Sequence, residues 1–194
     1  MSESPPRPPG RPRSAASRAA LLDAAYWQVV ERGYASVTAG SIAAAAGAGK
    51  QTLYRWWPSK GRLVLAAFVA KAHERIDRPR EAAIRAGELE KFLVADLAAA
   101  TSLFPALRFL LAEAQSEPDL LAALRLEILE PRVASLATVL SRRIPEPRGR
   151  ALAEAMEGAI LRRLLLGEPL DAGFAAELAG LATGCLKRDA AGAI

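Results

Sequence analysis

A short helix closed by a glycine on one side and by a proline on the other is the feature that most constrains this chain. Gly47 has no Cβ atom and can adopt the left-handed conformation that ends the helix predicted over residues 38–46. A second helix can begin near Gly49 and must end before Pro58, because the residue before a proline is pushed out of the helical region. Ser59 can cap the helix that follows. Two short helices joined by a tight turn predict a helix-turn-helix.

The second of these helices carries side chains suited to nucleic acid. Its N-terminal turns contain Lys50, Gln51 and Thr52. In a helix that enters the major groove of double-stranded DNA, the N-terminal turns contact base edges and residues at the rim contact phosphates. A lysine can donate to guanine, a glutamine can pair with adenine, and a threonine methyl group can contact thymine. We therefore expect these three residues to read bases.

The other residues of this helix divide into an inward and an outward set. Leu53 and Trp57 are four residues apart and form an inward apolar stripe, so we expect Trp57 in the core and Tyr54 facing DNA. Arg55 fits a DNA contact and a solvated charge equally well. Gly40, on the preceding helix, cannot read a base.

Together these residues resemble the DNA-binding domain of the TetR family of transcriptional regulators. The resemblance runs from about Ser14 to His73 and rests on the order and spacing of Leu21-Leu22-Asp23-Ala24-Ala25, Glu31-Arg32-Gly33-Tyr34, Val37-Thr38, Ile42-Ala43, Ala46-Gly47, Thr52-Leu53-Tyr54, Trp57 and Ser59-Lys60. It implies that Thr38, Tyr54, Trp56 and Lys60 hold the phosphate backbone. Thr38 also fits as the N-cap of the first short helix, where its hydroxyl would serve the helix.

The composition predicts an all-α fold. Alanine and leucine dominate and β-branched residues are few, which favours helix over strand. The first helix is expected from Ser14 to Arg32 and the fourth from Ser59 to Asp77. Breaks are expected near Arg78-Pro79, Gly87, Phe104-Pro105, Glu117-Pro118, Pro145-Glu146-Pro147 and residues 167–171, with a bend near Glu130 because Pro131 interrupts a helix. This gives about nine helices, the number that the TetR family has.

Charge and composition divide the chain into three regions. Residues 1–62 hold nine basic and three acidic side chains, whereas the remaining 132 residues hold 17 basic and 18 acidic ones, so the excess positive charge lies with the helix-turn-helix. Residues 1–13 are expected to be a disordered basic arm. Its Arg11 and Arg13 either enter the minor groove or add only non-specific attraction. Residues 14–74 form the expected DNA-binding domain and residues 75–194 a helical domain for effector binding and dimerisation.

The family resemblance implies a pocket for a small-molecule effector among the middle helices. The candidates there are mostly apolar, which suits a largely apolar effector, and Arg108, Gln115 or Arg125 could orient it. The full set is Leu93, Leu97, Phe104, Leu107, Arg108, Leu111, Gln115, Leu124, Arg125 and Ile128. Simple core packing is the alternative for most of them.

The last two helices, about Arg148–Leu166 and Asp171–Lys187, resemble the pair that forms the dimeric four-helix bundle of the family. Small and apolar residues recur on them at helical spacing. The candidates for a subunit interface are Leu152, Ala155, Met156, Ala159, Phe174, Ala176, Gly180 and Gly184. Packing within one subunit is the alternative. A homodimer would bind a pseudo-palindromic operator, because each subunit carries one DNA-binding unit.

Several other classes of protein fit the sequence poorly. One cysteine and one histidine exclude an internal disulfide and the usual multi-ligand zinc sites, so no metal or other cofactor is expected. His73 has no nucleophile motif beside it, and no glycine-rich phosphate loop follows a strand, so we expect no enzyme. Apolar runs such as Leu63 to Ala70 are shorter than the ~20 residues of a membrane span, and no signal peptide is evident, so we expect a cytoplasmic protein. The function expected is a ligand-responsive transcriptional regulator, usually a repressor in this family; the alternative is a ligand-independent architectural DNA-binding protein.

Overall fold

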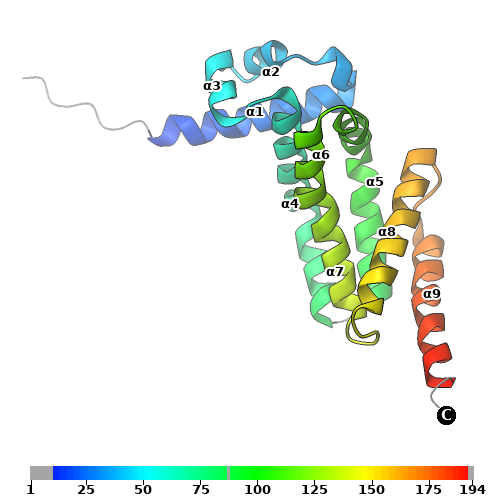
Figure 1. The fold of residues 1–194 in the computed structure, drawn as a ribbon. Helices are drawn as coiled ribbons and strands as arrows, with labels where there is room; N and C mark the ends of the chain where they lie inside the picture. The colour runs from blue at the N-terminus through cyan, green and yellow to red at the C-terminus, as the bar shows by residue number, and fades with distance from the viewer. Residues whose placement is uncertain (1–10, 87, 192–194) are drawn as a thin grey trace, which may run out of the picture. The chain divides into compact units, whose positions relative to one another are not determined.

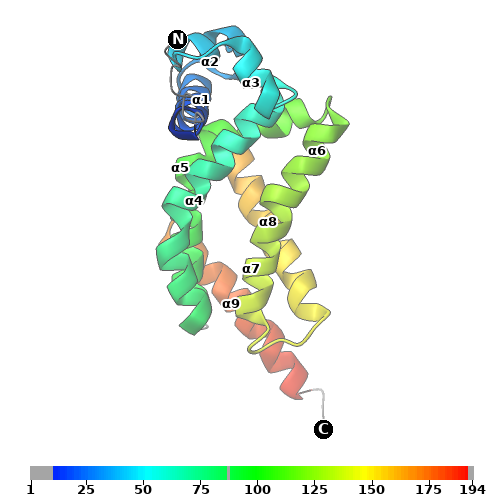
Figure 2. The same ribbon diagram turned by 90° about the vertical axis from the view of Figure 1, so that its left-hand side faces the viewer.

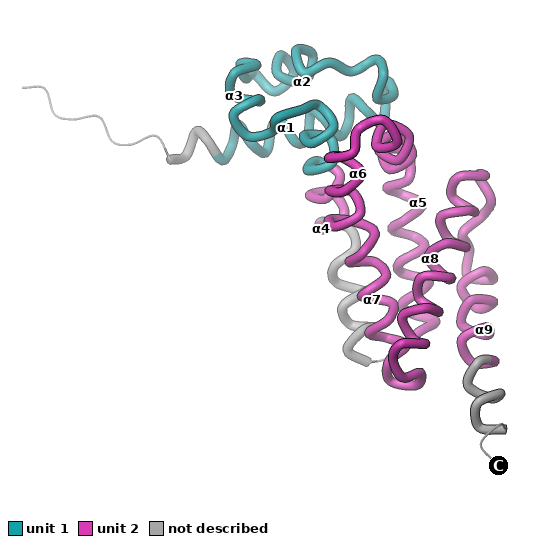
Figure 3. The backbone as a smooth tube through the Cα atoms, viewed as in Figure 1, with its two compact units in different colours: residues 1–67 teal, residues 68–194 magenta. Residues whose placement is uncertain are grey.

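The computed structural model describes residues 11–86 and 88–191, with side chains at positions 15–73, 83 and 88–184. This part of the chain contains nine α-helices, a 3-10 turn and a π-helical turn, and it has no β-strand (Figure 1). The expected all-α fold is therefore confirmed. Two compact units, residues 1–67 and 68–194, meet within the helix α4 (Lys60–Ala86), as the change of colour in Figure 3 shows. The domain boundary expected from the sequence, after residue 74, lies in the same helix.

The first unit consists of α1 (Arg11–Arg32), the 3-10 turn η1 (Tyr34–Ser36), α2 (Ala39–Ala45), α3 (Lys50–Trp56) and the start of α4. Helix α1 packs on η1 and α2, and α2 packs on α3. The apolar face of α1 is buried through Leu21, Ala25 and Val29, which recur at helical spacing.

Helix α1 begins earlier than expected, at Arg11 instead of Ser14. The first turn of this helix therefore lies in the segment that was expected to be a basic arm. Pro12 lies in the first helical turn, where a backbone N–H has no helical partner to lose, so it is compatible with the helix. Residues 1–10 of the expected basic arm, and the side chains of Arg11 and Arg13, lie outside the described residues.

The second unit contains the rest of α4 together with α5 (Leu89–Ala114), α6 (Pro118–Leu124), the π turn η2 (Arg125–Leu129), α7 (Glu130–Leu140), α8 (Arg148–Leu166) and α9 (Ala172–Ala191). Helix α7 packs along α8, and α5 packs against α9, α8 and α7. Their inward faces form one apolar core that includes Phe92 and Leu97 of α5, Leu136 of α7, Ile160 of α8 and Leu178 of α9.

Two of the expected helix breaks are wrong. Helix α4 continues past Pro79 to Ala86, and α5 continues through Pro105 to Ala114. Pro105 cannot donate a hydrogen bond to the preceding helical turn. Leu103, Ala106 and Leu107 on either side of it are nevertheless buried, so the packing of α5 outweighs this local cost.

The irregularity expected near Glu130 takes the form of the π turn η2, which precedes Pro131 within the continuous helical run from α6 to α7 (Figure 2). The N–H of Glu130 donates to the carbonyl of Arg125, five residues earlier. The wider turn lets the chain pass a residue that has no N–H, so α6, η2 and α7 follow one another without a loop.

Helix α5 is long and apolar enough, by length and composition, to cross a membrane, which the sequence analysis missed. Half of its most apolar 18-residue window is buried inside the second unit, as in the core helix of a packed domain. Such a helix alone is weak support for a membrane span.

Candidate functional site

The two short helices are bounded by the local interactions that the sequence predicts. Thr38 is the N-cap of α2: its Oγ1 accepts from the N–H of Ser41 at 3.0 Å, and Ser41 Oγ accepts from the N–H of Thr38 at 3.1 Å. At the other end, Gly47 has φ 60 and its N–H donates to Ala44 O at 3.1 Å, while the N–H of Ala48 donates to Ala43 O at 2.9 Å. This geometry fixes the direction in which α3 leaves the turn.

A buried glutamine joins α1 to α2. The side chain of Gln28 is only 8% exposed, and its Nε2 donates to the carbonyl of Ser41 at 3.1 Å. Ser41 Oγ lies 2.9 Å from Gln28 Oε1 and is well placed to donate to it. This link was not predicted from the sequence, although a polar residue within the apolar face of α1 was a usable signal.

The exposure of the residues on α3 follows the expected inward and outward division. Leu53 and Trp57 are buried, as predicted, and Tyr54 is 51% exposed. Lys50, Gln51 and Arg55 are exposed, whereas Thr52 and Trp56 are half-buried. The outward residues are thus accessible to DNA, and their contacts with bases and phosphates stay predictions.

Gly40 leaves room for the side chain of Lys50. A Cβ atom at Gly40 would lie 2.7 Å from Lys50 Cε, so the end of the lysine occupies the space above α2 that a larger residue would fill. Gly40 therefore contributes to the position of a predicted base-reading residue, although it can read no base itself.

Two arginines lie against the tryptophan pair at the end of α3. The guanidinium carbon of Arg55 is 5.6 Å from the ring centroid of Trp56, and that of Arg18 is 5.5 Å from the ring centroid of Trp57. The two tryptophan rings meet edge to face at 5.5 Å. These distances are typical of cation–π contacts. The exposed Arg18 comes from α1, and nothing in its local sequence pointed to this position.

Lys60 closes the loop between α1 and α2. Its Nζ donates to the carbonyls of Tyr34 and Val37, both at 3.0 Å, and lies 3.8 Å from the Tyr34 ring centroid. An ammonium group has three donors, so one is left for a phosphate. A DNA contact by Lys60 stays a prediction, but replacing Lys60 is now expected to weaken the first unit as well as DNA binding.

Replacing Gln51 with alanine is expected to change the preference at one base pair by roughly 1–3 kcal/mol, because the bidentate contact to adenine would be lost. Tyr54→Phe is the matched control, because it removes one predicted phosphate contact from the same helix and should weaken all sequences alike. The measurement is the affinity of each variant for an operator and its single-base-pair substitutions. An equal loss on every sequence for both variants would show that this division of roles is wrong.

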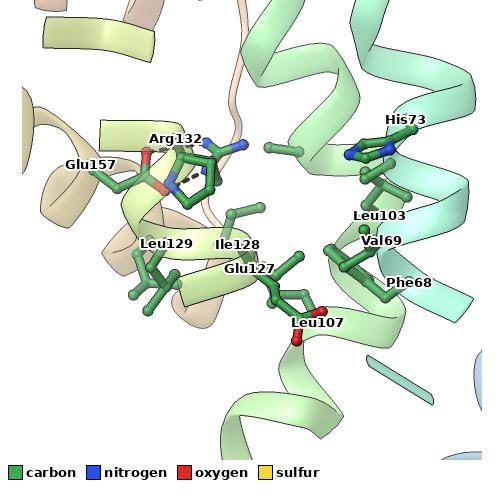
Figure 4. Close-up of a pocket in the computed structure, with 15 residues that line it drawn as sticks. Phe68, Val69, His73, Leu103, Leu107, Glu127, Ile128, Leu129, Arg132 and Glu157 are labelled. Carbon is green, nitrogen blue, oxygen red and sulfur yellow. Dashed lines mark hydrogen bonds and ion pairs between the residues drawn. The ribbon is translucent and has the colours of Figure 1, made fainter. Parts of the chain in front are cut away.

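A cavity of about 130 Å³ lies in the second unit (Figure 4). Most of its wall is apolar, and the lining residues come from α4, α5, η2, α7 and α8, with Phe68, Leu103, Ile128 and Leu164 among them. The polar residues of the wall are His73, Glu127, Arg132 and Glu157. The composition suits a small, mostly apolar ligand.

The cavity includes Leu107 and Ile128 from the predicted effector pocket, and the other eight candidates lie outside its wall. Leu93, Leu97 and Leu124 are buried core residues, and Phe104 packs against the core. The polar candidates also lie elsewhere: Arg108 and Arg125 are exposed, and the Gln115 amide donates to Leu111 O at 3.2 Å. The helical pattern could not separate core from cavity, and α4 and α8 provide walls that the sequence analysis assigned to other roles.

A buried ion network borders this cavity and was not predicted. Arg132 Nε lies 2.5 Å from Glu157 Oε1, and Arg132 Nη2 lies 2.8 Å from Asp96 Oδ2 and 3.1 Å from Glu157 Oε2. All three side chains are largely buried: Arg132 is 11% exposed, Glu157 is 13% exposed and Asp96 is 4% exposed. Burial alone would lower the pKa of Arg132, but the two carboxylates outweigh burial and raise that pKa above its ordinary value. The network joins α5, α7 and α8.

The residues expected at a subunit interface divide by exposure. Met156 and Phe174 are buried in the core of the second unit, and Leu152 and Ala159 pack against it. Within this chain these four therefore pack inside the subunit. The outward residues are Ala155, Ala176, Gly180 and Gly184, together with the exposed Leu165, Leu166 and Leu181. The last two helices thus expose these small and apolar residues beside charged side chains such as Arg162 and Glu177.

Comparisons with known proteins agree with this geometry. Residues 21–67 match the family described as "Bacterial regulatory proteins, tetR family". The chain is 31% identical over 173 residues to the DNA-binding transcriptional repressor TetR of Mycobacteroides abscessus, which covers 82% of this chain and 88% of that protein. It is 37% identical over 70 residues to the uncharacterized HTH-type transcriptional regulator YdeS of Bacillus subtilis. That match covers 36% of this chain and 35% of YdeS, so the chain matches only about a third of the length of that relative. The crystal structure of the TetR family transcription regulator SCO0332 superimposes with a TM-score of 0.68 and 31% identity, over 87% of this chain and 97% of that one.

Proposed function

The chain belongs to the TetR family of transcriptional regulators, which are non-enzymatic DNA-binding proteins, and we propose that it is a repressor released from its operator by a small, mostly apolar effector. The observation that carries the proposal is the cavity in the second unit. A separate helical unit with a cavity favours a ligand-responsive regulator over an architectural DNA-binding protein, which needs neither. The relative named as a repressor supports the direction of the effect.

Helix α4 supplies a physical route from the effector to DNA. Phe68, Val69, Ala72 and His73 of this helix line the cavity, and the same helix begins at Lys60, directly after the loop that follows α3. A ligand that favours one position of α4 would therefore bias the arrangement of the DNA-reading helix. Coupling of this kind requires that the effector bind the DNA-incompetent arrangement more tightly.

The proposal includes a homodimer in the cytoplasm that binds a pseudo-palindromic operator. The exposed small and apolar residues of α8 and α9 support the dimer, since Ala176, Gly180 and Gly184 repeat every four residues on α9 and would allow close approach of another helix. Two half-sites on one face of the DNA would then be read by two copies of α3.

The effector is expected to weaken operator binding by about 5–150-fold, which corresponds to a coupling of ~1–3 kcal/mol. Reciprocity requires that operator DNA weaken effector binding by the same factor. Ligands found by thermal-shift screening are to be titrated with and without an operator identified by genome-wide mapping of bound sites. A ligand with the same affinity in both titrations would not be an inducer, and the absence of any coupled ligand would favour the architectural alternative.

A further inference from the structure

We propose that the effector is an uncharged apolar molecule with a hydrogen-bond acceptor oxygen, such as a ketone, and that this oxygen accepts from Nη1 of Arg132. The inference rests on the proposed function, since it names the chemical class that the cavity would take. Arg132 was not among the polar residues that the sequence indicated for this role.

The donors of Arg132 are only partly used. A guanidinium group has five N–H donors. Nε donates to Glu157, and Nη2 donates to both Asp96 and Glu157, whereas Nη1 donates to no residue in the part of the chain that the structure describes. Arg132 is a wall residue of the cavity, and Figure 4 shows its guanidinium reaching from α7 toward the side where His73 lies. The cavity therefore presents donors and a cationic group at one end of an apolar space.

The charge around Arg132 selects against ionised ligands. One guanidinium faces two carboxylates, so a ligand carboxylate would bring further negative charge next to Asp96 and Glu157 in a poorly solvated site. A ligand ammonium would meet the N–H donors of Nη1, while both oxygens of Glu157 already accept from Arg132. Glu127 also lines the cavity, but its side chain is exposed, where water and salt screen its charge. A neutral hydrogen-bond acceptor adds no negative charge beside these carboxylates and places no positive charge against the N–H donors of Nη1.

The size of the cavity indicates a ligand body of about one aromatic ring. The cavity measures about 130 Å³. An apolar cavity of about 150 Å³ in another protein binds benzene. Phe68, Leu103, Leu161 and Leu164 supply the apolar wall that such a ring requires.

Four probes of nearly the same shape test the inference on the full-length protein by isothermal titration calorimetry. They are acetophenone, cumene, benzoate and protonated α-methylbenzylamine, which place an acceptor oxygen, a methyl group, an anion and a cation beside one phenyl ring. We expect acetophenone to bind about tenfold more tightly than cumene, the effect of one hydrogen bond to a charged donor, and the two ions to bind more weakly than acetophenone. Equal binding of acetophenone and cumene, tightest binding of either ion, or binding of none of the four would overturn the inference.

Arg132→Lys assigns the effect to the guanidinium. Lysine keeps a positive charge beside Asp96 and Glu157 but lacks the second arm of the fork. The preference for acetophenone over cumene should disappear in this variant, and the melting temperature reports whether it folds. The four-probe comparison on the unaltered protein needs no variant, so it decides the matter if Arg132→Lys does not fold. If the four probes rank as expected but none of them changes operator affinity, the proposed function is wrong and the inference about the ligand stands. If a ligand without an acceptor oxygen, such as cumene, releases the protein from DNA, the inference about the acceptor oxygen is wrong and the proposed function stands.

Discussion

Arg132→Ala is expected to lower the free energy of unfolding by about 3–5 kcal/mol. The substitution leaves Asp96 and Glu157 buried without the cation that both contact. An uncompensated buried carboxylate is strongly unfavourable, because the surrounding protein solvates it far less well than water does. Urea denaturation followed by circular dichroism measures the change.

The matched control for this experiment is Arg150→Ala. Arg150 also contacts two carboxylates, Glu130 at 2.7 Å and Glu154 at 3.1 Å, but all three side chains are substantially exposed. Solvent screens such pairs, so we expect no measurable change in stability. Similar losses for the two variants would mean that burial is not what makes the Arg132 network important.

Gly180→Leu is expected to separate the proposed dimer into monomers and to reduce operator affinity by about 10²–10⁴-fold, because binding of the second half-site would no longer be intramolecular. A Cβ atom at Gly180 meets no atom within 4 Å in the single chain. The substitution should therefore leave the subunit intact, and a large effect has to come from a second subunit. Sedimentation velocity and operator titration measure the two outcomes.

Ala122→Leu is the control for Gly180→Leu. Ala122 is exposed on α6, outside the proposed interface, so this variant adds a comparable apolar side chain without blocking α9. It should remain dimeric and keep its operator affinity. A Gly180→Leu protein that behaved in the same way would place the dimer interface elsewhere.

The helix-turn-helix could be predicted from the sequence because its boundaries depend on local backbone chemistry. The left-handed φ of Gly47, the capping hydroxyl of Thr38 and the extended residue before Pro58 each involve neighbours within a few positions. The burial of Leu53 and Trp57 followed from their spacing on one helix. These features hold wherever the rest of the chain packs.

The helix breaks and the cavity depended on packing between distant segments. Pro105 lies inside α5 because Leu103, Ala106 and Leu107 around it are buried in the core, which the local preference of proline could not indicate. An apolar helical face points inward both where other side chains fill the space opposite it, as at Leu93, and where that space is a cavity, as at Leu107. The helical pattern specifies a direction but not the distance to the opposite wall.

The Arg132 network is the clearest case in which only the tertiary structure decided the role of a residue. In the sequence Arg132 is one arginine among many, and its partners Asp96 and Glu157 lie 36 and 25 positions away. The sequence by itself determined a helical chain with its positive charge beside a DNA-reading helix, because composition, turn residues and helical spacing are local properties. The packing of α5, α7 and α8 decides which charges are buried together and which donor of Arg132 is left without a protein partner. The free energy of a charge pair depends on its burial, and only this packing creates that burial.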